Sequence, residues 1–257
     1  MKRRELAGMA VAALLAPVQA QAQVPVPALQ GYTENLPPLN YAGAAGTSGF
    51  SVELLRLMAG EVGLSLDIQV QPWIRAMRSA GEASNTVLFS LARLPEREAL
   101  FQWVGPISER RIVIYRLKRR ADIRFPGLEQ LQGLQGLHGL RIGAVRESAA
   151  AKRLLALGLL PEVDIEWALD DASNLRKLLA GRMDLLVMLD WAAAWHLREH
   201  KLPFASVTEV AALDTSVSYW FGLHPHGDPA IRLRLQAALD RLKRDGRYAK
   251  LRTRYFD

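Results

Sequence analysis

The stretch LRIGAVRESAAAKRLLALG (residues 140–158) changes from a strand pattern to a helix pattern within one short segment. Residues 140–145 predict a strand, and the spacing of apolar residues over 149–157 predicts a helix. Farther along, residues 163–167 and 183–189 predict two more strands, separated by a helix over 174–180 that Gly181 ends. Strands that alternate with helices predict a parallel sheet that is covered on both faces.

A second block of the same kind lies upstream. Apolar residues recur at helical spacing over 47–64, and residues 64–70 then alternate between apolar and polar, as a half-buried strand does. A helix over 73–80 and a strand over 86–90 follow. Near the other end of the chain, Asp228 and Pro229 form a favourable start for a helix with one apolar face. Two such α/β blocks predict a chain of two lobes.

The composition excludes several classes of protein. The chain has 257 residues, half of them hydrophobic, which is enough for a substantial buried core. It contains no cysteine, so disulfides and cysteine-ligated metals are excluded. The formal net charge is +7, but the basic residues are scattered among acidic ones except over 116–120. A nucleic-acid surface needs a basic stripe with stacking aromatics, so the charge indicates a solvated surface.

Residues 1–22 have the order of a secretory signal peptide. Lys2, Arg3 and Arg4 are followed by an apolar run over 6–18 and then by small residues, with cleavage predicted near residue 20 or 22. The alternative is an uncleaved membrane anchor, but the run is shorter than the ~20 apolar residues that a membrane span needs. The sequence therefore predicts export to the periplasm.

Four segments together resemble one protein family. The stretch ALDRLKRDGRYAKLRTRYFD (238–257) is similar to the end of family 3 bacterial extracellular solute-binding proteins, the polar amino-acid binding components of ABC transporters. The segments GFSVEL (49–54), FSLARLPEREALFQWVGPI (89–107) and LRIGAV (140–145) resemble family segments in the same order. From about residue 31 onward, the chain resembles a divergent branch of this family.

The resemblance implies a two-lobed α/β fold of the type II periplasmic-binding-protein class, in which the chain crosses between the lobes at two hinge crossings. The first crossing would fall near Tyr115 and the return near residues 218–221. Lobe 1 would then contain residues 23–115 plus 219–257, and lobe 2 would contain residues 116–218.

The resemblance also implies a ligand-binding arginine. Arg97 aligns with the family arginine that grips the ligand carboxylate, and a guanidinium pairs with a carboxylate through two parallel hydrogen bonds. Without the resemblance, Arg97 is a surface arginine in the ion-rich run 95–98. Arg93 lies in the same loop and is either a second cationic contact or a structural partner of Glu96.

Three further ligand-binding positions are implied in the first lobe, each with a structural alternative. Trp73 aligns with an aromatic residue that stacks on the ligand, and its alternative is packing in the core. Ser90 aligns with a hydroxyl that contacts the ligand, and its alternative is a plain strand-end serine. Glu34 lies where an acidic residue begins the first binding loop and accepts hydrogen bonds from a ligand amine. Its alternative is a solvated loop residue.

The second lobe departs from the family pattern at two places. Ser148 opens the helix after the strand over 140–145, where backbone N–H groups attract anions, but Glu147 adds a negative charge beside it. The family's aspartate for the ligand amine is expected one residue before Asp190. Asp190 therefore either follows a one-residue insertion or caps the next helix, and the chemical class of the ligand stays open.

The sequence predicts no cofactor and no metal site. His196 and His200 are four residues apart, as metal ligands on a helix can be. They lack the glutamate of a His-Glu-x-x-His motif, so they are interpreted as surface residues.

These features predict an exported solute-binding protein, not an enzyme, that closes on a small carboxylate-bearing ligand for uptake by an ABC transporter. The ligand would be an amino acid or a related compound. The partners would be this ligand and a membrane permease, with no nucleic acid, and the protein would be a monomer. Two alternatives stay open: a ligand-sensing module, and an enzyme of the dehydratase or lyase type in which Glu34 or Glu147 acts as acid or base.

Overall fold

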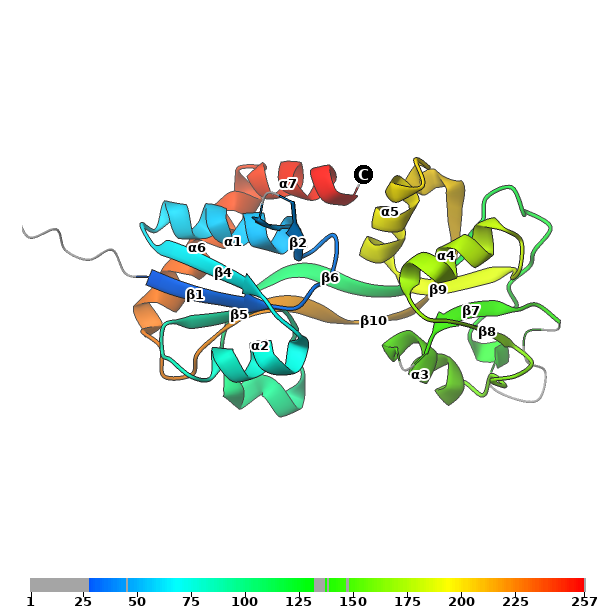
Figure 1. The fold of residues 1–257 in the computed structure, drawn as a ribbon, viewed down its shortest axis with the longest axis horizontal. Coiled ribbons are helices and arrows are strands. Elements are labelled where there is room, and N and C mark those ends of the chain that lie inside the picture. The colour runs from blue at the N-terminus through cyan, green and yellow to red at the C-terminus, as the bar shows by residue number, and fades with distance from the viewer. Residues whose placement is uncertain (1–27, 45, 132–136, 138, 147, 257) are drawn as a thin grey trace, which may run out of the picture.

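The chain folds into two α/β lobes that share two long strands. The structure, a computed structural model, describes residues 28–44, 46–131, 137, 139–146 and 148–256. Strands β6 (Gln102–Leu117) and β10 (Val207–Leu223) are paired along their length and run from one lobe into the other (Figure 1). The predicted two-lobed α/β fold is confirmed. The predicted signal peptide, residues 1–22, lies outside the described residues.

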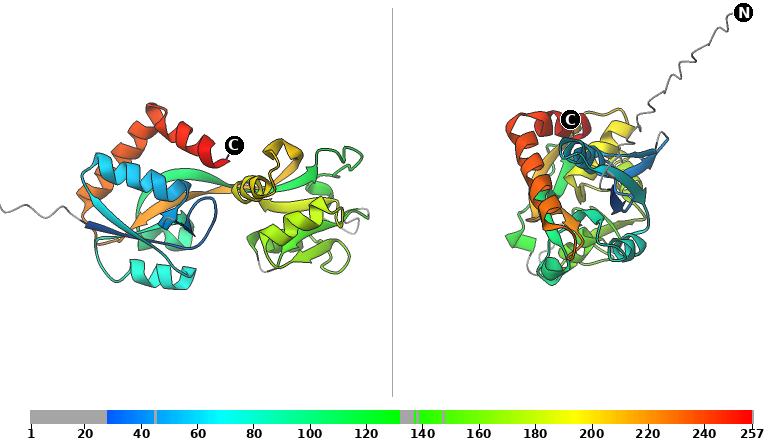
Figure 2. Two further views of the ribbon diagram at one scale, coloured as in Figure 1. Left: turned by 45° about the horizontal axis from the view of Figure 1, so that its top comes forward. Right: turned by 90° about the vertical axis from the view of Figure 1, so that its left-hand side faces the viewer.

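Lobe 1 contains the first half of the chain and its last two helices. Its elements are β1 (Ala28–Thr33), β2 (Tyr41–Gly43), β3 (Gly46–Ser48), α1 (Phe50–Glu61), β4 (Ser65–Val70), α2 (Trp73–Ala80), β5 (Thr86–Ala92), a 3₁₀ helix (Pro95–Leu100), α6 (Pro229–Arg244) and α7 (Arg247–Phe256). The strands lie in the order β4-β1-β5-β10-β6. Helices α1, α6 and α7 share one core cluster with the sheet, and α2 belongs to another. Figure 2 shows α6 and α7 returning onto lobe 1.

Lobe 2 continues the same sheet in the order β6-β9-β7-β8. Its further elements are a 3₁₀ helix (Glu129–Leu131), β7 (Ile142–Val145), α3 (Ala149–Ala156), β8 (Ile165–Ala168), α4 (Asp171–Leu179), β9 (Leu185–Leu189), α5 (Asp190–Glu199) and a 3₁₀ helix (Phe204–Ser206). Strands β7, β8 and β9 are parallel. One core cluster of the lobe contains α3, and the other contains α4 and α5.

The predicted start of the helix at Asp228 is confirmed. The Asp228 carboxylate accepts a hydrogen bond from the Ala230 N–H at 2.8 Å, and Pro229 is the first helical residue. The apolar face of α6 is buried against lobe 1 through Leu235, Ala238, Leu239 and Leu242. Local capping and helical periodicity therefore determine where this helix begins and which face it buries.

The lobes separate within β6 and β10. The first crossing was predicted near Tyr115, but β9 pairs with β6 from Ile112 onward, and the Tyr115 side chain packs in a lobe 2 core cluster. The pairing of β10 with β5 spans Tyr219 to Leu223, at the predicted return over 218–221. We therefore define lobe 1 as residues 28–107 and 219–256 and lobe 2 as residues 112–213. Residues 108–111 and 214–218 are the connecting segments.

Within the residues that the structure describes, every helix is too short or too polar to cross a bilayer.

Candidate functional site

The predicted binding residues gather where the parallel strands of both lobes end. Strand β5 is antiparallel to β10, and Ala92 at its carboxyl end lies opposite Tyr219. Strand β9 is antiparallel to β6, and Leu189 at its carboxyl end lies opposite Ile112. Strand β1 runs parallel to β5 and β4, and β7 runs parallel to β9, so the carboxyl ends within each set lie at the same edge of the sheet. The carboxyl ends of both sets of strands therefore face the junction between the lobes, where open α/β sheets bind ligands.

Three predicted residues of lobe 1 come together at this junction. The guanidinium carbon of Arg97 lies 5.6 Å from the centre of the Trp73 ring, and its Nη1 donates to the Ala92 carbonyl at 3.3 Å. Glu34, in the loop after β1, lies near the positive charge of Arg97. Burial raises the pKa of Glu34, and the Arg97 guanidinium partly offsets the rise. A cation, a carboxyl group and an aromatic face thus meet at the ends of three neighbouring strands.

Both interpretations of Trp73 have support in the structure. The half-buried ring packs against a core cluster of α2, β5 and β6 that contains Ala76, Ala80, Leu88, Leu91 and Trp103. The Arg97 guanidinium lies over the same ring. A ring held on one side by the core presents a fixed apolar surface on the other, which is suited to stacking on a ligand.

Ser90 is hydrogen-bonded inside the protein. It is 5 % exposed, and its φ of 55° places it in the left-handed region. Its hydroxyl donates to the Asn40 side-chain oxygen and lies 3.0 Å from the Ser51 hydroxyl oxygen. The Asn40 amide in turn donates to the Glu34 carbonyl at 2.5 Å. The hydroxyl therefore supports the loop that carries Glu34, in agreement with the structural alternative for Ser90.

Ser90→Ala is expected to lower the free energy of unfolding by about 1 to 3 kcal/mol, because the Asn40 oxygen loses its donor inside the protein. Urea denaturation measures the effect. The matched control is Ser84→Ala in the exposed turn before β5, which should change stability by less than about 0.5 kcal/mol. Equal stability of the two variants would contradict the supporting role.

Arg93 is paired within its own loop. Its Nε donates to the Glu98 carboxylate at 2.8 Å, and its second guanidinium nitrogen makes an ion pair with the same group. The guanidinium carbon lies 4.6 Å from the centre of the Trp220 ring. The structural partner of Arg93 is thus Glu98 and not the predicted Glu96, because the 3₁₀ helix brings Glu98 back toward the end of β5. This pairing holds the loop from which Arg97 projects.

Lobe 2 contributes a small pocket at the start of α3. The Ser148 hydroxyl accepts the Ala151 N–H at 3.0 Å and so caps the helix. Ser148 lines a pocket of about 90 Å³ together with residues at the ends of β7 and β9 and at the start of α4. Free backbone N–H groups at a helix start favour an anion, which agrees with the role predicted for this region. Glu147 lies outside the described residues.

Arg110 on β6 and Tyr219 on β10 also lie at the junction, and the sequence did not predict a role for either residue. Burial raises the pKa of Tyr219 to about 12, with Arg110 acting against the rise and Glu34 and Asp190 adding to it. Tyr219 thus lies near charged groups of both lobes. Arg110 pairs with Asp214 at 3.4 Å and lines the lobe 2 pocket. The run of charged residues over 109–111 resembles any exposed strand, so the sequence offers no signal for Arg110.

Asp190 lies apart from the lobe 2 pocket. It is 2 % exposed at the first residue of α5, and its carboxylate accepts the Trp191 N–H at 2.8 Å. It lines a separate cavity of about 210 Å³ that also contains Glu109, Tyr248 and Arg252. Burial raises the pKa of Asp190 to about 6, although the Trp191 N–H and nearby arginines lower it. This arrangement agrees with the interpretation of Asp190 as a residue of the helix start.

Among the described residues, no three His, Asp or Glu side chains lie close enough together to hold a metal ion. His196 is half-buried on α5, and burial lowers its pKa.

Comparison with known proteins agrees with this architecture. The model of the bacterial extracellular solute-binding proteins, family 3, matches residues 30–257. The chain is 27 % identical over 235 residues to membrane-bound lytic murein transglycosylase F of Ectopseudomonas mendocina (strain ymp), which covers 89 % of this chain and 46 % of that protein. It therefore spans about half the length of this relative. It is 23 % identical over 228 residues to the probable amino-acid-binding protein YxeM of Bacillus subtilis (strain 168), with 88 % and 83 % of the two chains covered.

Solved structures share the fold. An ancestral cationic amino acid solute-binding protein has a TM-score of 0.73 at 21 % identity and covers 90 % of this chain and 96 % of its own. A histidine kinase sensor domain with similarity to periplasmic binding proteins has a TM-score of 0.63 at 20 % identity, with 90 % and 96 % covered. The type II periplasmic-binding-protein fold is thereby confirmed. The family match over residues 30–257 confirms the resemblance as well, and the chain belongs to the bacterial extracellular solute-binding proteins, family 3.

Proposed function

We propose that this protein is an exported solute-binding protein that closes on a small carboxylate-bearing ligand, an amino acid or a related compound. The observation that carries the proposal is the gathering of Arg97, Trp73 and Glu34 at the junction that the lobe 2 pocket also faces. The protein acts in the periplasm as a monomer and delivers its ligand to the permease of an ABC transporter.

In this proposal Arg97 anchors the ligand carboxylate. Its planar fork of N–H donors matches the two oxygens of a carboxylate, and no ion pair within the described chain uses it. The Trp73 ring beside it provides the apolar surface for the rest of the ligand. Glu34 accepts hydrogen bonds from polar hydrogens of the ligand. These three residues make lobe 1 the part of the protein that binds the ligand first.

Closure then adds the contacts of lobe 2. Bending in the connecting segments brings the start of α3 onto the bound carboxylate, because backbone N–H groups at a helix start attract an anion. The ligand stabilises the closed form through the contacts that only this form makes with it. The closed form is the one that the permease recognises.

Arg97→Ala is expected to weaken binding of the carboxylate ligand by about 100-fold, because the charged ligand group then loses its partner at the junction. The test is thermal unfolding of the purified protein with a panel of L-amino acids and other small carboxylates. A compound that binds only the native state raises the unfolding midpoint as its concentration increases. The rise should disappear in Arg97→Ala at concentrations that suffice for the unmodified protein.

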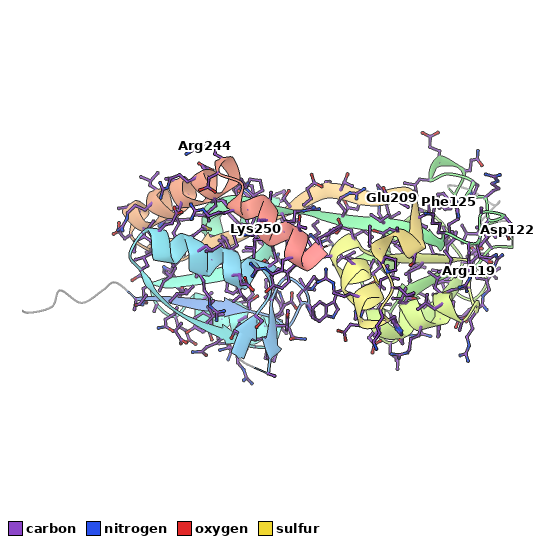
Figure 3. All side chains as sticks on the ribbon, turned by 90° about the horizontal axis from the view of Figure 1, so that it is seen from above. Arg119, Asp122, Phe125, Glu209, Arg244 and Lys250 are labelled. Atoms are coloured by element: carbon purple, nitrogen blue, oxygen red, sulfur yellow. The ribbon has the colours of Figure 1, made fainter. Side chains whose placement is uncertain are left out.

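The matched control is Arg244→Ala. Arg244 lies on the last turn of α6, on the outer surface of lobe 1 away from lobe 2 (Figure 3). This variant should respond to ligand as the unmodified protein does. A midpoint shift that survives in Arg97→Ala would refute the proposed anchor. No shift with any compound would withdraw the amino-acid proposal in favour of the alternatives below.

Two alternatives each have one supporting observation. The likeness to a sensor domain supports a ligand-sensing module with the same site. The transglycosylase relative and the raised pKa of Glu34 support an enzyme in which Glu34 is an acid or base. Conversion of a bound compound, followed by NMR and lost in Glu34→Gln, identifies an enzyme. Genes for a permease and an ATPase beside this gene favour transport over sensing.

A further inference from the structure

One face of helix α5 contacts lobe 1, although the helix belongs to lobe 2. Trp191, Trp195 and Arg198 have the spacing i, i+4 and i+7, which places their side chains on the same face of a helix. The Arg198 Nη1 donates to the Arg254 carbonyl of α7 at 3.0 Å. The residues of α5 that pack in a lobe 2 core cluster are Ala192, Ala193 and Leu197. Helix α5 is therefore held between the two lobes.

Two aromatic rings make most of this contact. Trp191 is 3 % exposed and belongs to the core cluster that α1, α6 and α7 form in lobe 1. The centre of its ring lies 4.9 Å from the centre of the Phe50 ring and 5.1 Å from that of Phe256. Trp195 is partly exposed, and its ring centre lies 5.1 Å from that of Tyr41 in β2. A residue of lobe 2 thus completes the core of lobe 1.

The contact lies on the opposite side of the connecting strands from the candidate binding site. Successive side chains of a strand point to opposite faces. Arg110 and Ile112 of β6 line the lobe 2 pocket, whereas Glu109 lines the cavity that Trp191 also lines. In Figure 1, α5 and α7 lie above the connecting strands, and α2 and α3 lie below them. The lobe 2 pocket is lined entirely by residues of lobe 2 and of the segment 108–111, so the site is open while α5 contacts lobe 1.

Closure of the site and the contact of α5 with lobe 1 oppose each other. The lobes turn about the connecting segments 108–111 and 214–218, and a rotation that narrows the gap on one side of these segments widens it on the other. Closure therefore withdraws the Trp191 ring from the core of lobe 1. When the form that binds the ligand is only a fraction of the protein, the apparent affinity is lowered by that fraction.

We propose that Trp191, Trp195 and Arg198 form a latch that holds the lobes apart on the side of the binding site. The two tryptophans are then positioning residues, which lower the affinity of the site without touching the ligand. This inference rests on the proposed function, in which the lobes close on a ligand. Loss of the latch should increase the closed fraction of the ligand-free protein and tighten binding. Truncation of a residue with a merely structural role would weaken binding or leave it unchanged, so the sign of the effect separates the two roles.

The test is the distance between the lobes in the ligand-free protein, measured by pulsed electron spin resonance. The chain contains no cysteine, so Ile74→Cys and Leu169→Cys place one spin label on each lobe. These side chains are 78 % and 89 % exposed and follow the carboxyl ends of β4 and β8, at the junction. The labelled protein with an intact latch should show one long distance. Trp195→Ala should increase the population of a shorter distance by about 3- to 10-fold, because it removes one aromatic pair.

The choice of variants separates the latch from an effect on folding. Trp195→Ala changes a partly exposed residue, whereas Trp191→Ala removes a large side chain from a core and adds a second, larger shift where the variant folds. Trp195→Phe keeps a ring opposite Tyr41 and should keep the long distance. Trp167→Ala is the matched control, since Trp167 is a partly buried tryptophan of β8 that packs within lobe 2. It should keep the long distance as well.

Binding provides the second readout. The probe is the L-amino acid or small carboxylate that raises the unfolding midpoint most in the panel above, titrated calorimetrically into unlabelled protein. Trp195→Ala should bind it about 3- to 10-fold more tightly than the unmodified protein does. An unchanged or longer distance in Trp195→Ala, or affinity that is unchanged or weaker, overturns the latch and leaves the proposed function standing. If no panel compound binds any variant, the proposed function is overturned, and the distances alone decide the latch.

Discussion

Gly49→Ala is expected to destabilise the protein by about 3 kcal/mol or more, because the position lacks both the space and the backbone conformation for a side chain. Gly49 precedes α1 with φ = 124°, which residues with a Cβ rarely adopt. A Cβ there would lie 2.4 Å from the Leu39 carbonyl oxygen and 2.8 Å from the Asn40 Cα. The Leu39 carbonyl also accepts the Ser51 N–H at 2.8 Å, so relief of the clash would break a backbone hydrogen bond.

The same substitution should weaken ligand binding, because Asn40 links Ser90 to the loop that carries Glu34. Urea denaturation followed by tryptophan fluorescence measures the stability. Gly60→Ala is the matched control within α1, where a Cβ meets no heavy atom within 4 Å. It should stabilise the helix by about 0.5 to 1 kcal/mol. Similar effects of the two alanines would show that Gly49 has no special conformational role.

One buried carboxyl group, Asp190, and one partly buried carboxyl group, Asp171, should make the protein lose stability as the pH rises from about 4 to about 6. Burial raises the pKa of both Asp171 and Asp190 to about 6. In this pH range the native state keeps protons that the unfolded chain has already released, so a rise in pH favours unfolding. A pKa that lies about two units above its usual value corresponds to about 3 kcal/mol of stability absent at pH 7.

Asp171→Asn and Asp190→Asn should therefore each raise the free energy of unfolding at pH 7 by about 2 kcal/mol, after allowance for the lost attraction between a carboxylate and a helix start. Little change is expected at pH 4, where the native carboxyl groups are already neutral. His196 gives stability the opposite dependence on pH. Burial lowers its pKa, so the unfolded chain binds a proton that the native state does not, and the protein loses stability as the pH drops below about 6.5. It is present in every variant, so the difference between variants isolates the carboxyl groups.

Asp170→Asn should change the free energy of unfolding at pH 7 in the opposite direction. The Ser173 N–H and hydroxyl hold the pKa of Asp170 below its usual value, so its ionised form stabilises the fold at neutral pH. This variant should be less stable than the unmodified protein at pH 7. Unchanged stability of Asp171→Asn at pH 7 would contradict the burial of its charge.

Short elements with strong local signals were predictable from the sequence. Helix α2 spans Trp73–Ala80, as predicted over 73–80, and α3 spans Ala149–Ala156 within the predicted 149–157. Helix α4 begins at Asp171, three residues before the predicted start at 174, because the capping box of Asp170 and Ser173 starts the helix ahead of the apolar spacing that predicts it. That signal is local, so the sequence contained it.

The long strands β6 and β10 were not predicted as such. Each obtains its hydrogen-bond partners from both lobes, with β5 and β9 lying far apart in the sequence. Their length is set by this pairing and not by their own alternation of apolar and polar residues. For the same reason the crossing was expected near Tyr115, although β9 draws Ile112 and the residues after it into lobe 2.

The sequence by itself determined the α/β class, the order of most elements and, through the family resemblance, the residues Arg97, Trp73 and Glu34 that meet at the junction. Only the tertiary structure decided which polar groups are already satisfied. Asn40 reaches Ser90 across 50 residues, and Arg110 reaches Asp214 across 104. These partners are far apart in the sequence and are brought together only by folding, so only the structure shows them, as it shows Asp190 and Arg252 lining one cavity.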